Sequence, residues 1–135
     1  RLLLLRALGI QIIDQEGRSM FPPGDSRTYE RTQRVIAAIS GVIMQLPNRL
    51  SIAGHTDGSP PSRAGQSNWE LSAERANAAR RILQSSGVPG DRVSLISGKA
   101  DSEPLFPDDP TLPGNRRISI TLLREAPVLP PDHKL

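Results

Sequence analysis

Segments with strand-like and helix-like hydrophobic periodicity alternate along this chain, and their order limits the folds that it can adopt. The strand-like segments are residues 10–14, 49–56, 92–97 and 116–123, and the helix-like segments are residues 27–45 and 68–86. The order strand, helix, strand, helix, strand, strand predicts an α/β (α+β) two-layer sandwich, in which two main helices pack on one face of a mixed sheet. A length of 135 residues suits one such domain.

Local signals predict where the helices begin and end. Ser67 and Glu70 have the S-x-x-E spacing of a capping box, which starts the second helix. Gly87 readily adopts a left-handed cap conformation, and Pro89 prevents the helix from continuing. Ser26 is expected to cap the first helix.

Strand periodicity predicts which side chains face the helices. In the last strand, Ile118 and Ile120 alternate with polar residues, and the same parity puts Arg116 on the helix-facing side. In the third strand, Val93 and Leu95 are expected to share one face. Because Arg116 shares the parity of Ile118 and Ile120, its side chain is expected at the edge of the core.

The composition disfavours several kinds of site. The chain has no cysteine, which excludes disulfides and thiolate metal sites. Aromatic residues make up 3% of the chain and the arginines lie on both helix faces, so nucleic-acid binding is disfavoured. The formal net charge of +3 suits an anionic partner. We expect no cofactor and no metal.

Charged residues of opposite sign are predicted at one end of the sheet. Asp57 follows the second strand, where a loop rich in Gly, Pro and Ser begins. Arg75 borders the apolar stripe of the second helix, where a guanidinium needs a partner because burying an unpaired charge is costly. A salt bridge between the two is slightly favoured by the residues alone. The alternative is a ligand site, in which Asp57 binds an ammonium group and Arg75 a carboxylate.

An enzyme is the competing class. His55 and Asp57 lie close together in the sequence and could serve a hydrolase, but no nucleophile elbow accompanies them. His55 is better interpreted as a structural histidine at the end of a strand. We therefore expect a protein that is not an enzyme.

Three ordered segments carry a resemblance to a known family. GHTD (54–57), SNWELSAERA (67–76) and NRRISI (115–120) resemble the OmpA-like peptidoglycan-binding domain. Within that superfamily, IQIIDQEGRSMFPPGD (10–25) and SNWELSAERANAARRIL (67–83) are similar to the MotB-like flagellar stator proteins. Because the three segments occur in order and at the expected loop positions, the resemblance is specific.

The resemblance implies a βαβαββ core with a defined ligand. Asp57 and Arg75 occupy the positions that in this family bind diaminopimelate, the residue of the peptidoglycan stem peptide that carries both an ammonium group and a carboxylate. The family pattern also implies walls or supports of the pocket at Thr56, Asn68, Leu71, Asn115 and Arg116.

The resemblance further implies a location and partners. It places the domain in the periplasm as a homodimer that anchors the flagellar motor stator to the cell wall, joined to MotA through a membrane segment preceding it. Residues 1–9, which begin with Arg1, would be the remnant of a linker helix, 10–124 the peptidoglycan-binding domain and 125–135 a C-terminal tail. The alternative is a cell-wall anchor of a non-flagellar envelope protein.

Overall fold

The computed structural model describes residues 8–124. The expectations of a linker helix and a C-terminal tail therefore fall largely on residues 1–7 and 125–135, which lie outside this range. Leu8 and Gly9 belong to the first strand, so the expectation of a helix is wrong for these two residues. In the described range, no helix combines the length and the apolar character needed to cross a membrane.

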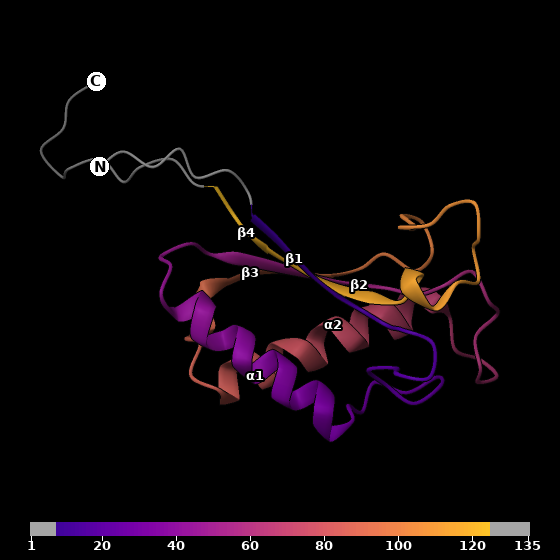
Figure 1. The fold of residues 1–135 in the computed structure, drawn as a ribbon, viewed down its shortest axis with the longest axis horizontal. Helices are drawn as coiled ribbons and strands as arrows, with labels where there is room; N and C mark the ends of the chain where they lie inside the picture. Colours follow the sequence, from indigo (N-terminus) through magenta and orange to yellow (C-terminus); the bar gives the residue numbers. More distant parts are fainter. Residues whose placement is uncertain (1–7, 125–135) are drawn as a thin grey trace, which may run out of the picture.

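The elements follow the predicted order. They are β1 (Leu8–Ile13), α1 (Glu30–Met44), β2 (Leu50–His55), α2 (Asn68–Ser85), β3 (Val93–Gly98) and β4 (Arg117–Leu122), with short 3-10 turns η1 (Gly90–Arg92) and η2 (Pro113–Asn115). The sheet order is β1-β4-β2-β3, with β4 antiparallel to both neighbours and β2 parallel to β3. Both helices lie on one side of this sheet (Figure 1). The predicted two-layer sandwich with a mixed sheet is confirmed.

The core lies between the helices and the inward face of the sheet. Its most buried large side chains are Ile36 and Ile43 of α1, Leu83 of α2, Leu50 and Ile52 of β2, and Ile118 and Ile120 of β4. Their spacing is that of the predicted stripes, with a period near 3.6 on the helices and two on the strands. The apolar pattern of the sequence thus locates the core.

Two glycines let α2 lie directly on the sheet. A Cβ atom on Gly54 of β2 would lie 2.0 Å from the carbonyl oxygen of Ser72, and one on Gly98 of β3 would lie 2.5 Å from the backbone nitrogen of Ala73. Such distances are far inside van der Waals contact, so only glycine permits this approach. The close contact fixes the N-terminal half of α2 beside the end of β2.

The first helix begins later than predicted. The N-cap residue of α1 is Tyr29, without a side-chain capping bond, so the expected cap at Ser26 is wrong. The preceding chain is instead held by other bonds: the Asp25 carboxylate accepts from the backbone N–H of Arg27, and the N–H of Tyr29 donates to the Met20 carbonyl. The capping box of α2, by contrast, is present as predicted.

The third strand departs from simple alternation. The register against β2 shifts between Leu50 and Ser51, which pair with Val93 and Leu95, so Ser94 is an extra residue. The bulge reverses the parity beyond it. Leu95 is therefore 57% exposed, whereas Val93 and Ile96 pack against the core, and the prediction that Val93 and Leu95 share one face is wrong.

Candidate binding site

Several segments far apart in the sequence meet at one end of the sheet. The loops after β1, β2 and β3 gather there (Figure 1). Residues of the loops after β1 and β2, together with residues of α2 and the residue before β4, surround a cavity of about 270 Å³. The lining residues are Ser19, Phe21, Pro23, Gly24, Thr56, Asp57, Ser59, Pro60, Pro61, Ser62, Asn68, Leu71, Arg75 and Arg116. A cavity of this size can hold one amino-acid-sized group.

Asp57 supplies the carboxylate of this cavity. Its Oδ1 accepts the backbone N–H of Ser59 at 2.8 Å, which is an Asx-turn that opens the long loop. Its Oδ2 accepts from Arg116 Nη1 at 2.6 Å. The neighbouring loop is tied to α2, because Asn68 Nδ2 donates to the Ser59 carbonyl at 3.1 Å. The carboxylate of Asp57 is thus held in a fixed direction by the loop after β2 and by Arg116.

Arg75 supplies a cation to the cavity, and within residues 8–124 no carboxylate forms an ion pair with it. Its Nε donates to the Asp25 carbonyl at 2.8 Å and its Nη2 to the Pro22 carbonyl at 3.1 Å. The guanidinium also lies 4.8 Å from the ring centroid of Phe21. Arg75 is 6% exposed, and burial lowers its pKa, although arginine stays charged at neutral pH. The loop after β1 therefore orients Arg75 while leaving its charge available.

Arg116 joins two carboxylates. Its Nε donates to Asp14 Oδ2 at 2.9 Å, and its Nη1 reaches Asp57. Burial disfavours the charged form, but the hydrogen bonds to Asp14 and then Asp57 outweigh that effect and raise the pKa of Arg116. Arg116 therefore forms ion pairs with both carboxylates.

Asn115 supports the site from behind and does not line the cavity. It is 1% exposed, and its side chain holds the loop after β3: Oδ1 accepts from Phe106 N at 2.7 Å, and Nδ2 donates to the Asp109 carbonyl at 2.9 Å. That loop reaches the cavity region, because the N–H of Gly58 donates to the Pro110 carbonyl at 2.7 Å. Asn115 thus acts on the site through the loop.

The structure brings together six of the seven residues singled out from the sequence, all but Asn115. In the part of the chain that the structure describes, no ion pair joins Asp57 to Arg75, so the predicted mutual salt bridge is wrong. Sequence reasoning missed Asp14 and Phe21. Asp14 follows the inward residues of β1 at strand spacing, which was a usable signal, whereas nothing local indicated that Phe21 would lie against Arg75.

The geometry does not bring His55 and Asp57 into one catalytic arrangement. His55 Nε2 lies 3.2 Å from Ser119 Oγ, on the face of the sheet turned away from the helices, and Asp57 binds Arg116 instead. His55 is also not among the residues lining the cavity. Within residues 8–124, no group of three or more acidic or histidine side chains is placed to hold a metal ion.

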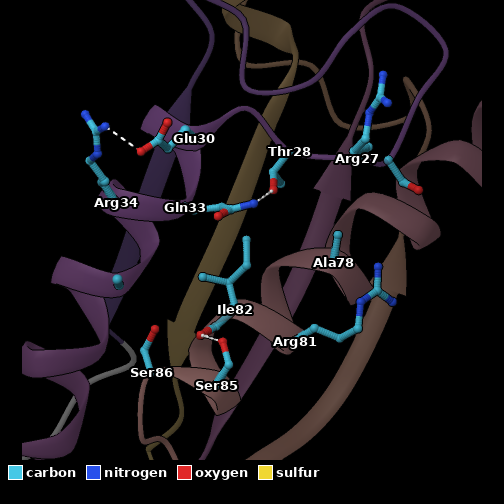
Figure 2. A pocket seen from close by; sticks show the side chains of 12 residues that line it. Arg27, Thr28, Glu30, Gln33, Arg34, Ala78, Arg81, Ile82, Ser85 and Ser86 are labelled. Carbon is cyan, nitrogen blue, oxygen red and sulfur yellow. Dashed lines mark hydrogen bonds and ion pairs between the residues drawn. The ribbon is translucent and has the colours of Figure 1, made fainter.

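A larger hollow lies elsewhere, between α1 and α2. It measures about 690 Å³ and includes Arg27, Arg34 and Arg81 among its lining residues. Figure 2 shows Arg34 turned toward Glu30, with which it forms an ion pair of 2.7 Å. Both of these side chains are more than 70% exposed, so the pair is solvated and weakly held. The smaller cavity, with buried and oriented charges, is the better candidate for ligand recognition.

Comparison with known protein sequences places these features in context. Motility protein B of Escherichia coli strain K12 is 40% identical over 125 residues, which are 91% of this chain and 41% of that protein. The putative truncated flagellar export/assembly protein LafU of the same strain is 34% identical over 121 residues, which are 90% of this chain and 57% of that protein. The chain thus spans roughly half the length of these curated relatives.

Solved structures share the fold. A putative MotB-like protein from Desulfovibrio vulgaris has a TM-score of 0.74 and 27% identity, over 89% of this chain and 75% of that one. The cell wall anchor of the T6SS from Pseudomonas aeruginosa has a TM-score of 0.73 and 22% identity, over 88% and 82% of the two chains. A family model described as the OmpA family matches residues 20–117. Because that match spans most of the chain, this chain belongs to the OmpA family.

Proposed function

We propose that this domain binds peptidoglycan without catalysis, through the diaminopimelate of the stem peptide. Asp57 binds the ammonium group of that residue, and Arg75 binds its carboxylate. The observation that carries the proposal is that one small cavity presents both a fixed carboxylate and a buried guanidinium held by neutral carbonyls. A zwitterionic group is the chemistry that such a pair of charges complements.

The remaining cavity residues fit supporting roles. The hydroxyl of Thr56 is buried and has no hydrogen-bond partner in the described residues, so it can bond to a ligand. Leu71 gives the cavity an apolar wall, and Asn68 fixes the rim through the Ser59 carbonyl. Arg116 orients Asp57, and Asn115 supports the adjoining loop.

The biological setting is part of the same proposal. The relatives include a motility protein and structures described as periplasmic domains of MotB. We propose that the domain works in the periplasm as a homodimer, and that it anchors a flagellar motor stator to the cell wall. In a longer protein, a preceding membrane segment would join it to MotA.

A second setting has its own support. The cell wall anchor of the T6SS has a TM-score close to that of the MotB structures, so the fold also serves a non-flagellar envelope machine. An anchor of that kind would use the same cavity. A domain swap distinguishes the two settings, with this domain replacing the equivalent part of a stator protein. Restored motility would favour the flagellar setting. Cell-wall binding without motility would favour the non-flagellar setting.

Sedimentation with purified sacculi tests the binding proposal. Wild-type protein is expected to sediment with sacculi, and Asp57→Asn and Arg75→Lys are each expected to reduce the bound fraction at least tenfold. Lysine keeps the charge but lacks the planar fork that binds a carboxylate through two bonds. Arg81→Ala, on the exposed side of α2, is the matched control and should bind as wild type. Normal binding by both cavity variants would show that the ligand binds elsewhere.

A further inference from the structure

The charged groups of the cavity form two separate units. Asp14, Arg116 and Asp57 are joined by hydrogen bonds and carry a formal net charge of −1; we call them the carboxylate cluster. Arg75 is the other unit, and its hydrogen bonds go to neutral carbonyls. The cavity therefore has a negative side and a positive side.

Asp14 decides the sign of the carboxylate cluster. Without it, Arg116 and Asp57 would form a neutral pair, with the guanidinium 2.6 Å from the carboxylate that is to receive an ammonium group. A neutral pair attracts a cation much less than a cluster with a net negative charge. Arg116 alone would thus cancel most of the attraction of Asp57.

The geometry of Asp14 fits this role. Its side chain is almost completely buried, with Oδ1 accepting the backbone N–H of Met20 at 2.8 Å and Oδ2 accepting from Arg116 at 2.9 Å. Asp14 is not among the residues lining the cavity, so it acts through Arg116. Its position also favours the charged form of Arg75, since Asp14 is the strongest charge raising the pKa of that guanidinium.

We propose that Asp14 is a positioning residue that sets the ligand specificity of the cavity. By binding Arg116, it keeps the carboxylate cluster at a net charge of −1 and so makes the cavity select ligands that carry an ammonium group beside a carboxylate. This inference rests on the proposed function, and it concerns a residue outside the direct ligand contacts.

The test compares two ligands on several variants by calorimetry. The probes are an N-terminally blocked stem tripeptide ending in diaminopimelate and the same peptide with its free amino group acetylated. Wild type is expected to prefer the free amine, and Asp14→Asn to reduce that preference by roughly tenfold, the effect of one unit charge in a partly buried site. Asp91→Asn, an exposed change of the same charge in η1, should leave the preference unchanged.

The double variant Asp14→Asn/Arg116→Gln separates charge from structure. It returns the carboxylate cluster to a net charge of −1, so it should regain the preference that Asp14→Asn loses, which a structural role for Asp14 would not produce. An unchanged preference in Asp14→Asn, or no recovery in the double variant, overturns the inference. If Asp14→Asn does not fold, Arg116→Gln alone tests the inference. It gives the carboxylate cluster a net charge of −2, so it should raise the preference for the free amine, and a lower preference would contradict the inference. If wild type binds neither peptide, the proposed function itself fails.

Discussion

Arg75 illustrates how a buried cation can be held in place by hydrogen bonds without being neutralised by an ion pair. Backbone carbonyls carry only partial charges, so they satisfy the guanidinium N–H groups and leave a net positive charge facing the cavity. The ring of Phe21 adds a cation–π contact. A carboxylate in the same place would have formed a closed salt bridge. The choice of partner therefore decides whether Arg75 is structural or available for binding.

Asn115 is expected to affect stability more strongly than most single polar residues. Asn115→Ala removes its bonds to the backbone at Phe106, Asp109 and Pro110 and leaves the partly buried N–H group of Phe106 without its acceptor. The expected loss in the free energy of unfolding is about 2–3 kcal/mol. Urea denaturation measures it, with Asn77→Ala on α2 as the control, expected within about 0.5 kcal/mol of wild type. Equal stability of the two variants would contradict the role given to Asn115.

The placement of α2 against β2 and β3 controls the site at the next level of organisation. Arg75 is carried by α2, while Asp57 follows β2, so the distance between the two charges depends on how closely the helix approaches the sheet. Gly54 and Gly98 remove the side chains that would hold the helix away. The capping box at Ser67 then starts α2 at a defined residue. The position and the register of α2 together determine where Arg75 lies relative to Asp57 in the cavity.

Gly54→Ala tests the effect of that close contact. The added methyl group would collide with the carbonyl oxygen of Ser72, so the helix must shift, and the free energy of unfolding should fall by about 1–3 kcal/mol or more. Binding to sacculi should also weaken, because the shift moves Arg75. Gly41→Ala is the control: a Cβ there meets nothing within 4 Å, and alanine in a helix should raise stability by about 0.5–1 kcal/mol. Thermal unfolding that ranks the two variants the other way would refute this account.

The molecule as a whole separates two polar regions on the two faces of its sheet. The helix side carries the cavity. On the opposite side, His55 is 5% exposed, lies across from Arg117 in the sheet and contacts Ser119. Burial, and next the charge of Arg117, lower the pKa of His55 to about 4. The histidine is therefore neutral in the folded protein at neutral pH.

This depressed pKa predicts how stability depends on pH. In the unfolded chain His55 takes up a proton near its ordinary pKa of 6.5, whereas the folded chain resists protonation until about pH 4. The contribution of His55 is thus fully present above pH 6.5, is lost as the pH falls toward 4, and amounts to at most about 3 kcal/mol. Denaturation of wild type and His55→Gln at several pH values measures it as the difference between the two curves. A constant difference across this window would rule out the proposed protonation effect.

Much of the fold and part of the site follow from local patterns. Ile118 and Ile120 predicted the inward face of β4, and Ser67 with Glu70 predicted the start of α2. The errors fall where a distant contact overrides a local pattern. The bulge at Ser94, which pairing with β2 creates, exposes Leu95. Bonds from Met20 and Asp25 delay the start of α1.

The sequence by itself determined the order of the elements, the position of the core and the two charged residues at the end of the sheet, because hydrophobic period and capping depend on residues near one another. Only the tertiary structure decided the partners of those charges. Asp57 and Arg75 are separated from Arg116, Asp14 and Phe21 by long stretches of chain, and no local pattern states which side chains the folded sheet will bring within hydrogen-bonding distance. Strand order brings Arg116 between two carboxylates, and among the residues that the structure describes Arg75 forms no ion pair with either of them.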